Sequence, residues 1–100
     1  MAYTLKLHRA VEKQLQRIPK KQRERLVQTM RSLRTEPRPN GSEKLEDNLY
    51  RIRQGDYRVI YAVFDEEVVI VICKVARRAE STYRALQPLL ERARSLLVED

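Results

Sequence analysis

The stretch that decides the fold of this chain reads Tyr50-Arg51-Ile52-Arg53-Gln54-Gly55-Asp56-Tyr57-Arg58-Val59-Ile60-Tyr61. At its centre, Gly55-Asp56 is a two-residue turn of the type that joins antiparallel strands, because glycine accepts a positive φ at the first position. The residues on either side suit strands, from about Leu49 to Gln54 and from Tyr57 to Phe64. The stretch therefore predicts a β-hairpin.

Arginines gather on one side of this hairpin. With Gly55-Asp56 as the loop, Arg53 lies opposite Arg58, and Arg51 lies opposite Ile60. Side chains alternate between the two faces of a strand, so the three arginines share one face and are expected to line a basic cleft. Like charges that face each other oppose folding, and a site for a polyanion would explain their presence.

The segments around the hairpin complete the fold. Alternating apolar residues predict a strand from Tyr3 to Leu7, and helical spacing then predicts two helices, the second beginning at Pro19. A loop over residues 36–42, rich in proline and glycine, ends the second helix. After the hairpin, a further strand runs from about Val68 to Val75, and a last helix runs from about Ser81 to Leu97.

The order of these elements, β-α-α-β-β-β-α, predicts a single α+β domain over residues 1–100. We expect an antiparallel sheet with the helical hairpin on one face and a C-terminal helix that closes the chain. The arginines would lie on the other face, which would be partly open. Pro88 lies inside the last helical pattern, so it should start that helix late or kink it.

The chain is basic, and its charge is unevenly distributed. Its 21 Lys and Arg against 14 Asp and Glu give a net charge of +7, which favours a nucleic-acid or ribosomal partner. Between Arg9 and Arg38, ten basic residues stand against three acidic ones, an excess that equals the whole net charge. The basic side chains on the outer side of the second helix are Lys20, Lys21, Arg23, Arg31 and Arg34.

Several kinds of function are excluded by what the sequence lacks. The single histidine, His8, rules out a two-histidine ribonuclease mechanism within one chain, and its place before a helix suits a surface or capping role. The sequence has no metal-ligand cluster and no glycine-rich phosphate loop, so we expect no metal and no cofactor. The lone Cys73 lies in an apolar run and is expected to be a buried thiol. We expect no signal peptide and no membrane span, and a reducing cytoplasm suits the chain.

A group of basic residues remains as the candidate site. Guanidinium groups clamp phosphate oxygens and stabilise the negative charge that a phosphorane gains in a transition state. The set comprises Arg51, Arg53, Arg58, Arg77 and Arg78, with Lys44, Lys74 and Tyr83 near in sequence. Only one of Arg77 and Arg78 can point into a given cleft. The alternative is a solvated strand face with loose pairs to Asp56, Asp65 or Glu80.

Motifs along nearly the whole chain point to one family. They are Lys44-Leu45, Leu49 to Arg53, Gly55 to Tyr61, Val75 to Arg78, and Tyr83-Arg84. Together with the first strand and the helical hairpin, they resemble the RelE branch of the RelE/ParE toxin superfamily. The resemblance implies the toxin of a type II toxin–antitoxin pair, which binds the ribosomal A site and cuts the mRNA there. In that reaction the 2′-hydroxyl attacks the adjacent phosphate and leaves a 2′,3′-cyclic phosphate and a 5′-hydroxyl.

The resemblance also implies roles for individual residues. Arg51 and Arg53 stand where the family has basic, often lysine, residues, and Arg58 and Arg78 match family arginines. Tyr83 matches a tyrosine that stacks on the codon or assists proton transfer. The implied catalytic set is therefore Arg51, Arg53, Arg58, Arg78 and Tyr83. The implied RNA contacts are Lys20, Lys21, Arg23, Arg31, Arg34, Lys44 and Lys74.

The chain departs from the family pattern at the first strand of the hairpin. Arginine is effectively never deprotonated, so Arg51 and Arg53 can stabilise charge but make poor general bases. The spacing from Arg78 to Tyr83 is also variable in the family. The general base is therefore open, and the candidates are Tyr83, Lys74, Lys44, Glu80 and a water held by the ribosome.

The resemblance implies three partners: a cognate antitoxin encoded by an adjacent gene, the ribosome, and mRNA. Operator DNA would be contacted only through the antitoxin complex. An apolar stripe on the last helix either packs on the sheet or extends to an amphipathic antitoxin helix. The stripe consists of Leu86, Leu89, Leu90, Ala93, Leu96 and Leu97. Two other functions stay open: a ParE-like inhibitor of DNA gyrase, and a non-toxic RNA- or ribosome-binding module.

Overall fold

The predicted hairpin forms as β3 (Leu49–Gln54) and β4 (Tyr57–Phe64), joined by Gly55 and Asp56. It is seen in a computed structural model of the chain, which describes residues 2–77 and 86–98. Gly55 adopts a φ of 60°, the left-handed conformation for which glycine is suited. The strand register confirms the predicted pairs, with Arg53 opposite Arg58 and Arg51 opposite Ile60.

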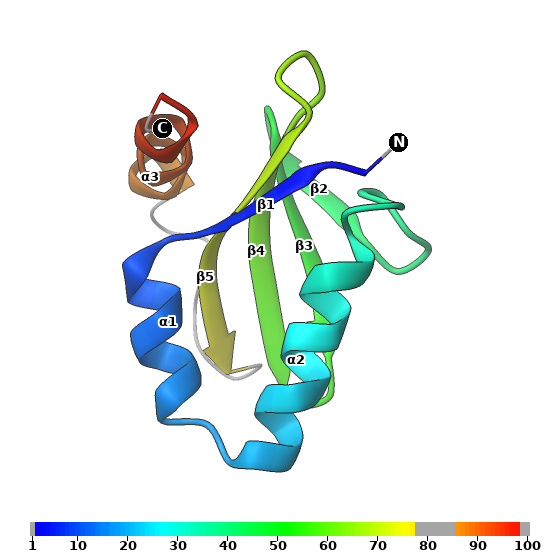
Figure 1. Cartoon of the computed structure of the whole chain (residues 1–100), viewed down its shortest axis with the longest axis vertical. Coiled ribbons are helices and arrows are strands. Elements are labelled where there is room, and N and C mark those ends of the chain that lie inside the picture. Colours follow the sequence, from blue (N-terminus) through cyan, green and yellow to red (C-terminus); the bar gives the residue numbers. More distant parts are fainter. Residues whose placement is uncertain (1, 78–85, 99–100) are drawn as a thin grey trace.

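The hairpin is the middle of a five-stranded sheet in the order β1-β5-β4-β3-β2 (Figure 1). The outer strands are β1 (Thr4–Leu7) and β2 (Glu43–Glu46), and β5 (Val69–Arg77) lies between β1 and β4. The sequence pattern missed β2, so the element order gains one strand and becomes β-α-α-β-β-β-β-α. The sheet is also not wholly antiparallel, because β1 pairs with β5 in parallel.

Two helices cover one face of the sheet, as predicted. They are α1 (Arg9–Gln16) and α2 (Lys20–Ser32), which lie in front of the sheet in Figure 1. Pro19 is the N-cap of α2 rather than its first residue. The His8 Nδ1 accepts a hydrogen bond of 3.1 Å from the Ala10 amide, which confirms its capping role. The buried side chains between these helices and the sheet are Val11, Leu15, Ile18, Leu26, Met30, Leu33, Tyr57, Val59, Tyr61, Val63, Ile70, Ile72 and Val75.

The third helix, α3 (Leu86–Leu97), packs on the opposite face. Its Leu89, Leu90 and Ala93 are buried against strand residues of that face, among them Leu49, Ile60, Ala62, Phe64, Val71 and Cys73. Burial of a leucine side chain contributes about 1.5–3 kcal/mol, so this contact anchors the helix firmly. The predicted start of the helix near Ser81 lies outside the described residues, and Pro88 falls in the first turn of the described part. The apolar stripe therefore packs on the sheet.

The remaining predictions from composition concern Cys73 and membranes. Cys73 is fully buried, and its burial raises the thiol pKa to about 12. It is therefore a structural thiol, as predicted, because the thiolate is the reactive form. No helix within the described ranges is long and apolar enough to cross a membrane.

Candidate functional site

Arg51, Arg53 and Arg58 share one face of the sheet, and we call this set the arginine face. The parity of the strands establishes it, because Leu49 and Ile60 are buried beneath α3. Arg51 and Arg53 follow Leu49 at intervals of two residues, and Arg58 precedes Ile60 by two. All three arginines thus lie on the α3 side, toward the Gly55 end of the hairpin. A cleft around them stays a prediction, since it would also involve residues 78–85, which lie outside the described ranges.

A β-bulge adds Lys74 to this face. Between β4 and β5 the register shifts by one residue, so that Tyr61 pairs with Ile72 while Ile60 pairs with Lys74. Cys73 is the extra residue on the bulged strand. Lys74 thereby comes to the same side of the sheet as Ile60, beside the arginines. Without the bulge, alternation from Ile72 would have turned Lys74 toward α1 and α2.

Two other predicted site residues lie on the helical side instead. Lys44 is opposite Tyr50, which packs against the core beneath α1 and α2. Arg77 is opposite Tyr57, which is buried in that same core. Neither residue therefore shares the arginine face. Arg78, Glu80 and Tyr83 lie outside the described residues.

Glu43 is a component of the site that the sequence pattern did not reveal. The missed strand β2 places Glu43 directly opposite Arg51, and the Glu43 Oε2 forms an ion pair with Arg51 Nη2. The side chain of Arg51 is 16% exposed, whereas that of Glu43 is 59% exposed. A solvent-facing carboxylate thus adjoins the arginine face. One row of directly opposite residues crosses four neighbouring strands, and it consists of Glu43, Arg51, Ile60 and Lys74.

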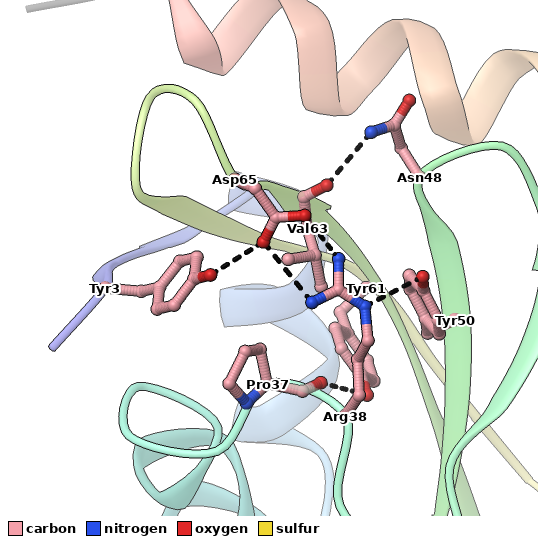
Figure 2. Close-up of polar contacts among 8 residues, drawn as sticks. All are labelled: Tyr3, Pro37, Arg38, Asn48, Tyr50, Tyr61, Val63 and Asp65. Carbon is pink, nitrogen blue, oxygen red and sulfur yellow. Dashed lines mark hydrogen bonds and ion pairs between the residues drawn. The ribbon is translucent and has the colours of Figure 1, made fainter. Parts of the chain in front are cut away.

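The position of β2 is fixed by its turn to β3. Asn48 lies in that turn with a φ of 66°, and asparagine tolerates this left-handed conformation better than most residues. The Asn48 Nδ2 donates a hydrogen bond of 3.0 Å to the Val63 carbonyl (Figure 2). The Val63 amide donates one of 2.8 Å to the Asn48 carbonyl. These contacts tie the β2–β3 turn to β4 and so hold Glu43 in register with Arg51.

A second basic surface lies on α2. Lys20, Lys21 and Arg31 are exposed, Arg23 is partly exposed, and the sequence pattern overlooked exposed Arg25. Arg34 follows the helix, and its Nε donates a hydrogen bond of 3.0 Å to the Tyr3 carbonyl. The exposed cations lie along the solvent side of α2, as the sequence predicts. They form a surface suited to sequence-independent contact with a phosphate backbone.

The first turns of α2 meet the end of the β3–β4 hairpin. Gln22 and Arg25 line a cavity of about 150 Å³ together with Gln54, Gly55, Asp56 and Tyr57. In Figure 1 the first turns of α2 and the hairpin turn lie at the same end of the molecule. The first turns of α2 therefore lie beside the turn that ends the arginine face, although α2 and that face are on opposite sides of the sheet.

Polar residues at the opposite end of the sheet form a structural cluster rather than a site (Figure 2). Arg38 Nη2 forms an ion pair of 2.6 Å with Asp65 Oδ2, and Arg38 Nε donates a hydrogen bond of 2.9 Å to the Tyr50 hydroxyl. The Tyr3 hydroxyl donates to Asp65 Oδ1 at 2.6 Å. Asp65 is thus paired with Arg38. It is not a partner of the arginine face, although the sequence left such a pair open.

This cluster fixes the loop that leads into β2. The Tyr61 hydroxyl donates a hydrogen bond of 2.8 Å to the Pro37 carbonyl, and burial raises the pKa of Tyr61 to about 12. The Arg38 guanidinium also lies 5.2 Å from the centre of the Tyr50 ring, within the range of a cation–π contact. The bonds from Arg38 and Tyr3 lower the pKa of Asp65 below its usual value. The loop is therefore fastened to β3, β4 and the β4–β5 turn.

Comparison with known proteins identifies relatives over most of the chain. A family model described as "ParE toxin of type II toxin-antitoxin system, parDE" matches residues 5–82. A chain of the archaeal RelE–RelB complex from Pyrococcus horikoshii is 36% identical with a TM-score of 0.71, and the match covers 81% of this chain and 100% of that one. A chain of the toxin–antitoxin complex RelBE2 from Mycobacterium tuberculosis is 25% identical with a TM-score of 0.69, covering 80% and 95%. A chain of the intact E. coli RelBE toxin–antitoxin complex is 26% identical with a TM-score of 0.68, covering 80% and 100%.

Proposed function

Because the chain belongs to the ParE toxin family of type II toxin–antitoxin systems and has the fold of RelE toxins, we propose that it is a ribosome-dependent endoribonuclease. It would cleave mRNA in the ribosomal A site through attack of a 2′-hydroxyl on the adjacent phosphate. The observation that carries this proposal is the arginine face, a row of guanidinium groups that strand register holds together.

Each guanidinium of the arginine face can bind a phosphate and stabilise the negative charge that the phosphate gains in the transition state. Arg53 and Arg58 are opposite each other on adjacent strands, and Arg51 lies two residues before Arg53 on the same face. Planar guanidinium groups bind two phosphate oxygens at once, and groups fixed before the reaction stabilise the transition state without reorganising. Arg78 and Tyr83 would complete this set, as the resemblance to RelE toxins implies.

The basic side of α2 would supply affinity for the ribosome. Its exposed lysines and arginines are suited to the ribosomal RNA backbone, a contact that depends on charge rather than sequence. Since the first turns of α2 lie beside the hairpin turn that ends the arginine face, one protein orientation would bring both surfaces to RNA. Binding through α2 would then present the arginine face to the mRNA.

The proposed partner in the cell is a cognate antitoxin. The similar structures from M. tuberculosis and E. coli are described as toxin–antitoxin complexes, and the one from P. horikoshii is described as a RelE–RelB complex. An acidic antitoxin segment would neutralise the arginine face, either directly or by displacing α3. Such a segment folds as it binds and covers a large surface.

The second candidate function is inhibition of DNA gyrase, because the matching family model describes ParE toxins. A gyrase inhibitor would bind its target without cutting RNA. The arginine face favours the endoribonuclease, since a phosphate-directed row of arginines has a direct use in RNA cleavage.

The deciding experiment incubates the purified protein with programmed ribosomes and maps the mRNA ends. We expect cuts within the A-site codon that leave a 2′,3′-cyclic phosphate and a 5′-hydroxyl, with no cleavage of the same mRNA free in solution. A parallel assay follows DNA supercoiling by gyrase. Intact mRNA together with arrested supercoiling would replace the first function by the second.

A further inference from the structure

We infer that Glu43 is the general base and Lys74 the general acid of the cleavage reaction, with Arg51 between them. The inference rests on the proposed function and assigns both a proton acceptor and a proton donor, whereas the sequence left the general base open. It follows from β2 and from the β5 bulge, which bring a carboxylate and an ammonium group to the arginine face.

The two groups stand at opposite ends of one row across the sheet. The row runs from Glu43 on β2 through Arg51 and Ile60 to Lys74 on β5. Neighbouring strands are about 4.8 Å apart, so the two backbones at the ends are separated by about 14 Å. Ile60 within the row is buried beneath α3, so a phosphodiester held by the arginines would lie on the Gly55 side of the row. Both end side chains are long and flexible enough to reach toward it.

An in-line displacement requires this arrangement, because the attacking and leaving oxygens lie on opposite sides of the phosphorus. One proton must be removed on the first side and one must be supplied on the second. A carboxylate accepts a proton and an ammonium group donates one, whereas an arginine does neither readily. Glu43 and Lys74 thus have the two chemical properties that the three arginines lack.

The proposed step conserves atoms and charge. The Glu43 carboxylate takes the 2′-hydroxyl proton as the 2′-oxygen forms its bond to phosphorus. The bond from phosphorus to the 5′-oxygen breaks, and the Lys74 ammonium gives its proton to that oxygen. The products are a 2′,3′-cyclic phosphate and a 5′-hydroxyl, and exchange with water restores both side chains.

The ion pair between Glu43 and Arg51 positions the carboxylate in the free protein. It directs a side chain that is 59% exposed toward the arginine face rather than into solvent. A substrate phosphate would compete for the Arg51 guanidinium, and the carboxylate would then be released beside the incoming 2′-hydroxyl. Arg51 therefore pairs with the Glu43 carboxylate in the free protein and with the phosphate once substrate is bound.

The test uses single-turnover cleavage on programmed ribosomes with saturating protein, over a range of pH. The variants are Glu43→Gln, which keeps the shape but cannot take a proton, and Lys74→Arg, which keeps the charge but donates poorly. The matched controls are Glu66→Gln in the β4–β5 turn and Lys13→Arg on α1, both at exposed positions away from the arginine face. A second mRNA carries sulfur in place of the 5′-bridging oxygen, and this leaving group needs no general acid.

We expect Glu43→Gln and Lys74→Arg each to slow cleavage of the normal mRNA by about 10²-fold or more, the scale of one lost proton transfer. With the sulfur-substituted mRNA, Lys74→Arg should cleave at nearly the wild-type rate, while Glu43→Gln should stay slow. The wild-type rate should rise with pH on the acidic side, and Glu43→Gln should lose this rise. Both control variants should match the wild type throughout.

Each other outcome overturns a defined part of the inference. Cleavage by Glu43→Gln at the wild-type rate removes Glu43 as the base, and a Lys74→Arg defect that the sulfur substitution does not relieve removes Lys74 as the acid. A wild-type protein that leaves ribosome-bound mRNA intact overturns the proposed function, and with it this assignment.

Discussion

Arg53 lies directly opposite Arg58 across the β3–β4 pair, on the face of the sheet where α3 packs. Two like charges at opposite positions repel each other and lower the stability of the hairpin. The fold tolerates this pair because β4 is anchored from below by fully buried Val59, Tyr61 and Val63. A stable platform thus holds two residues of like charge at directly opposite positions of the hairpin.

The repulsion predicts that Arg53→Glu stabilises the protein. An opposite-charge pair in place of a like-charge pair should raise the free energy of unfolding by roughly 0.2–1 kcal/mol. Urea unfolding measures the change at low salt, and added salt should reduce it. The control is Arg77→Glu, which makes the same change of charge near the same end of the sheet. Residue 77 is opposite Tyr57 and not Arg58. Equal effects of the two changes would argue against repulsion between Arg53 and Arg58.

The proposed chemistry predicts that Arg58→Ala and Arg78→Ala each lower cleavage on programmed ribosomes by about 10²-fold or more. This is the scale of losing one donor that stabilises transition-state charge. Arg58 is partly exposed and belongs to neither hydrophobic cluster, so thermal unfolding of this variant should remain cooperative. Arg77→Ala is the matched control and should cleave normally. If both variants cleave at the wild-type rate, these arginines have no part in the mechanism.

The basic surface of α2 predicts a salt-dependent contact with the ribosome. Reversal of Lys20, Lys21 and Arg23 to Glu should weaken binding and flatten its dependence on salt. Each phosphate contact that is lost should lower the slope of log K against log salt by about one unit. Sedimentation with ribosomes at several salt concentrations measures this slope. An unchanged slope would mean that this side of α2 is only a solvated surface.

The lowered pKa of Asp65 predicts that the protein loses stability in acid. The bonds from Arg38 and Tyr3 lower the folded-state pKa of Asp65 below the usual 3.8. A lowered pKa means that the carboxylate stabilises the fold above about pH 4 and that this contribution disappears as the pH falls through the folded-state value. Asp65→Asn should therefore be less stable than the wild type at pH 7, and the difference should shrink below pH 4 in unfolding measurements. A difference that is constant with pH would contradict the ionic role of Asp65.

The hairpin shows how far the sequence alone reaches. Gly55-Asp56 gives the turn, the turn gives the register, and the two-residue period of a strand then puts Arg51, Arg53 and Arg58 on one face. All three steps use neighbours in sequence, so each could be made without a structure. The same local signals identified α1, α2 and the other strands of the meander.

Glu43 and Lys74 show where this reasoning stops. The segment Glu43–Glu46 has no regular alternation, and it forms a strand because the outer edge of β3 offers unpaired hydrogen-bonding groups. Lys74 reaches the arginine face through a one-residue register shift, and such a shift reverses the face of every residue beyond it. Both placements depend on how neighbouring strands pair, which composition and periodicity do not encode.

The final prediction concerns the antitoxin. The product of an adjacent gene, expressed together with this protein, should co-purify with it and relieve growth arrest, because an acidic segment can neutralise Arg51, Arg53 and Arg58. The apolar stripe of α3 packs on the sheet in the free protein, so an antitoxin helix that occupied the same site would have to displace α3. A disulfide that links α3 to the sheet separates the two possibilities. Binding that survives the cross-link points to direct neutralisation, and binding that returns only on reduction points to displacement. If the pair does not co-purify and arrest persists, the partner assignment is wrong.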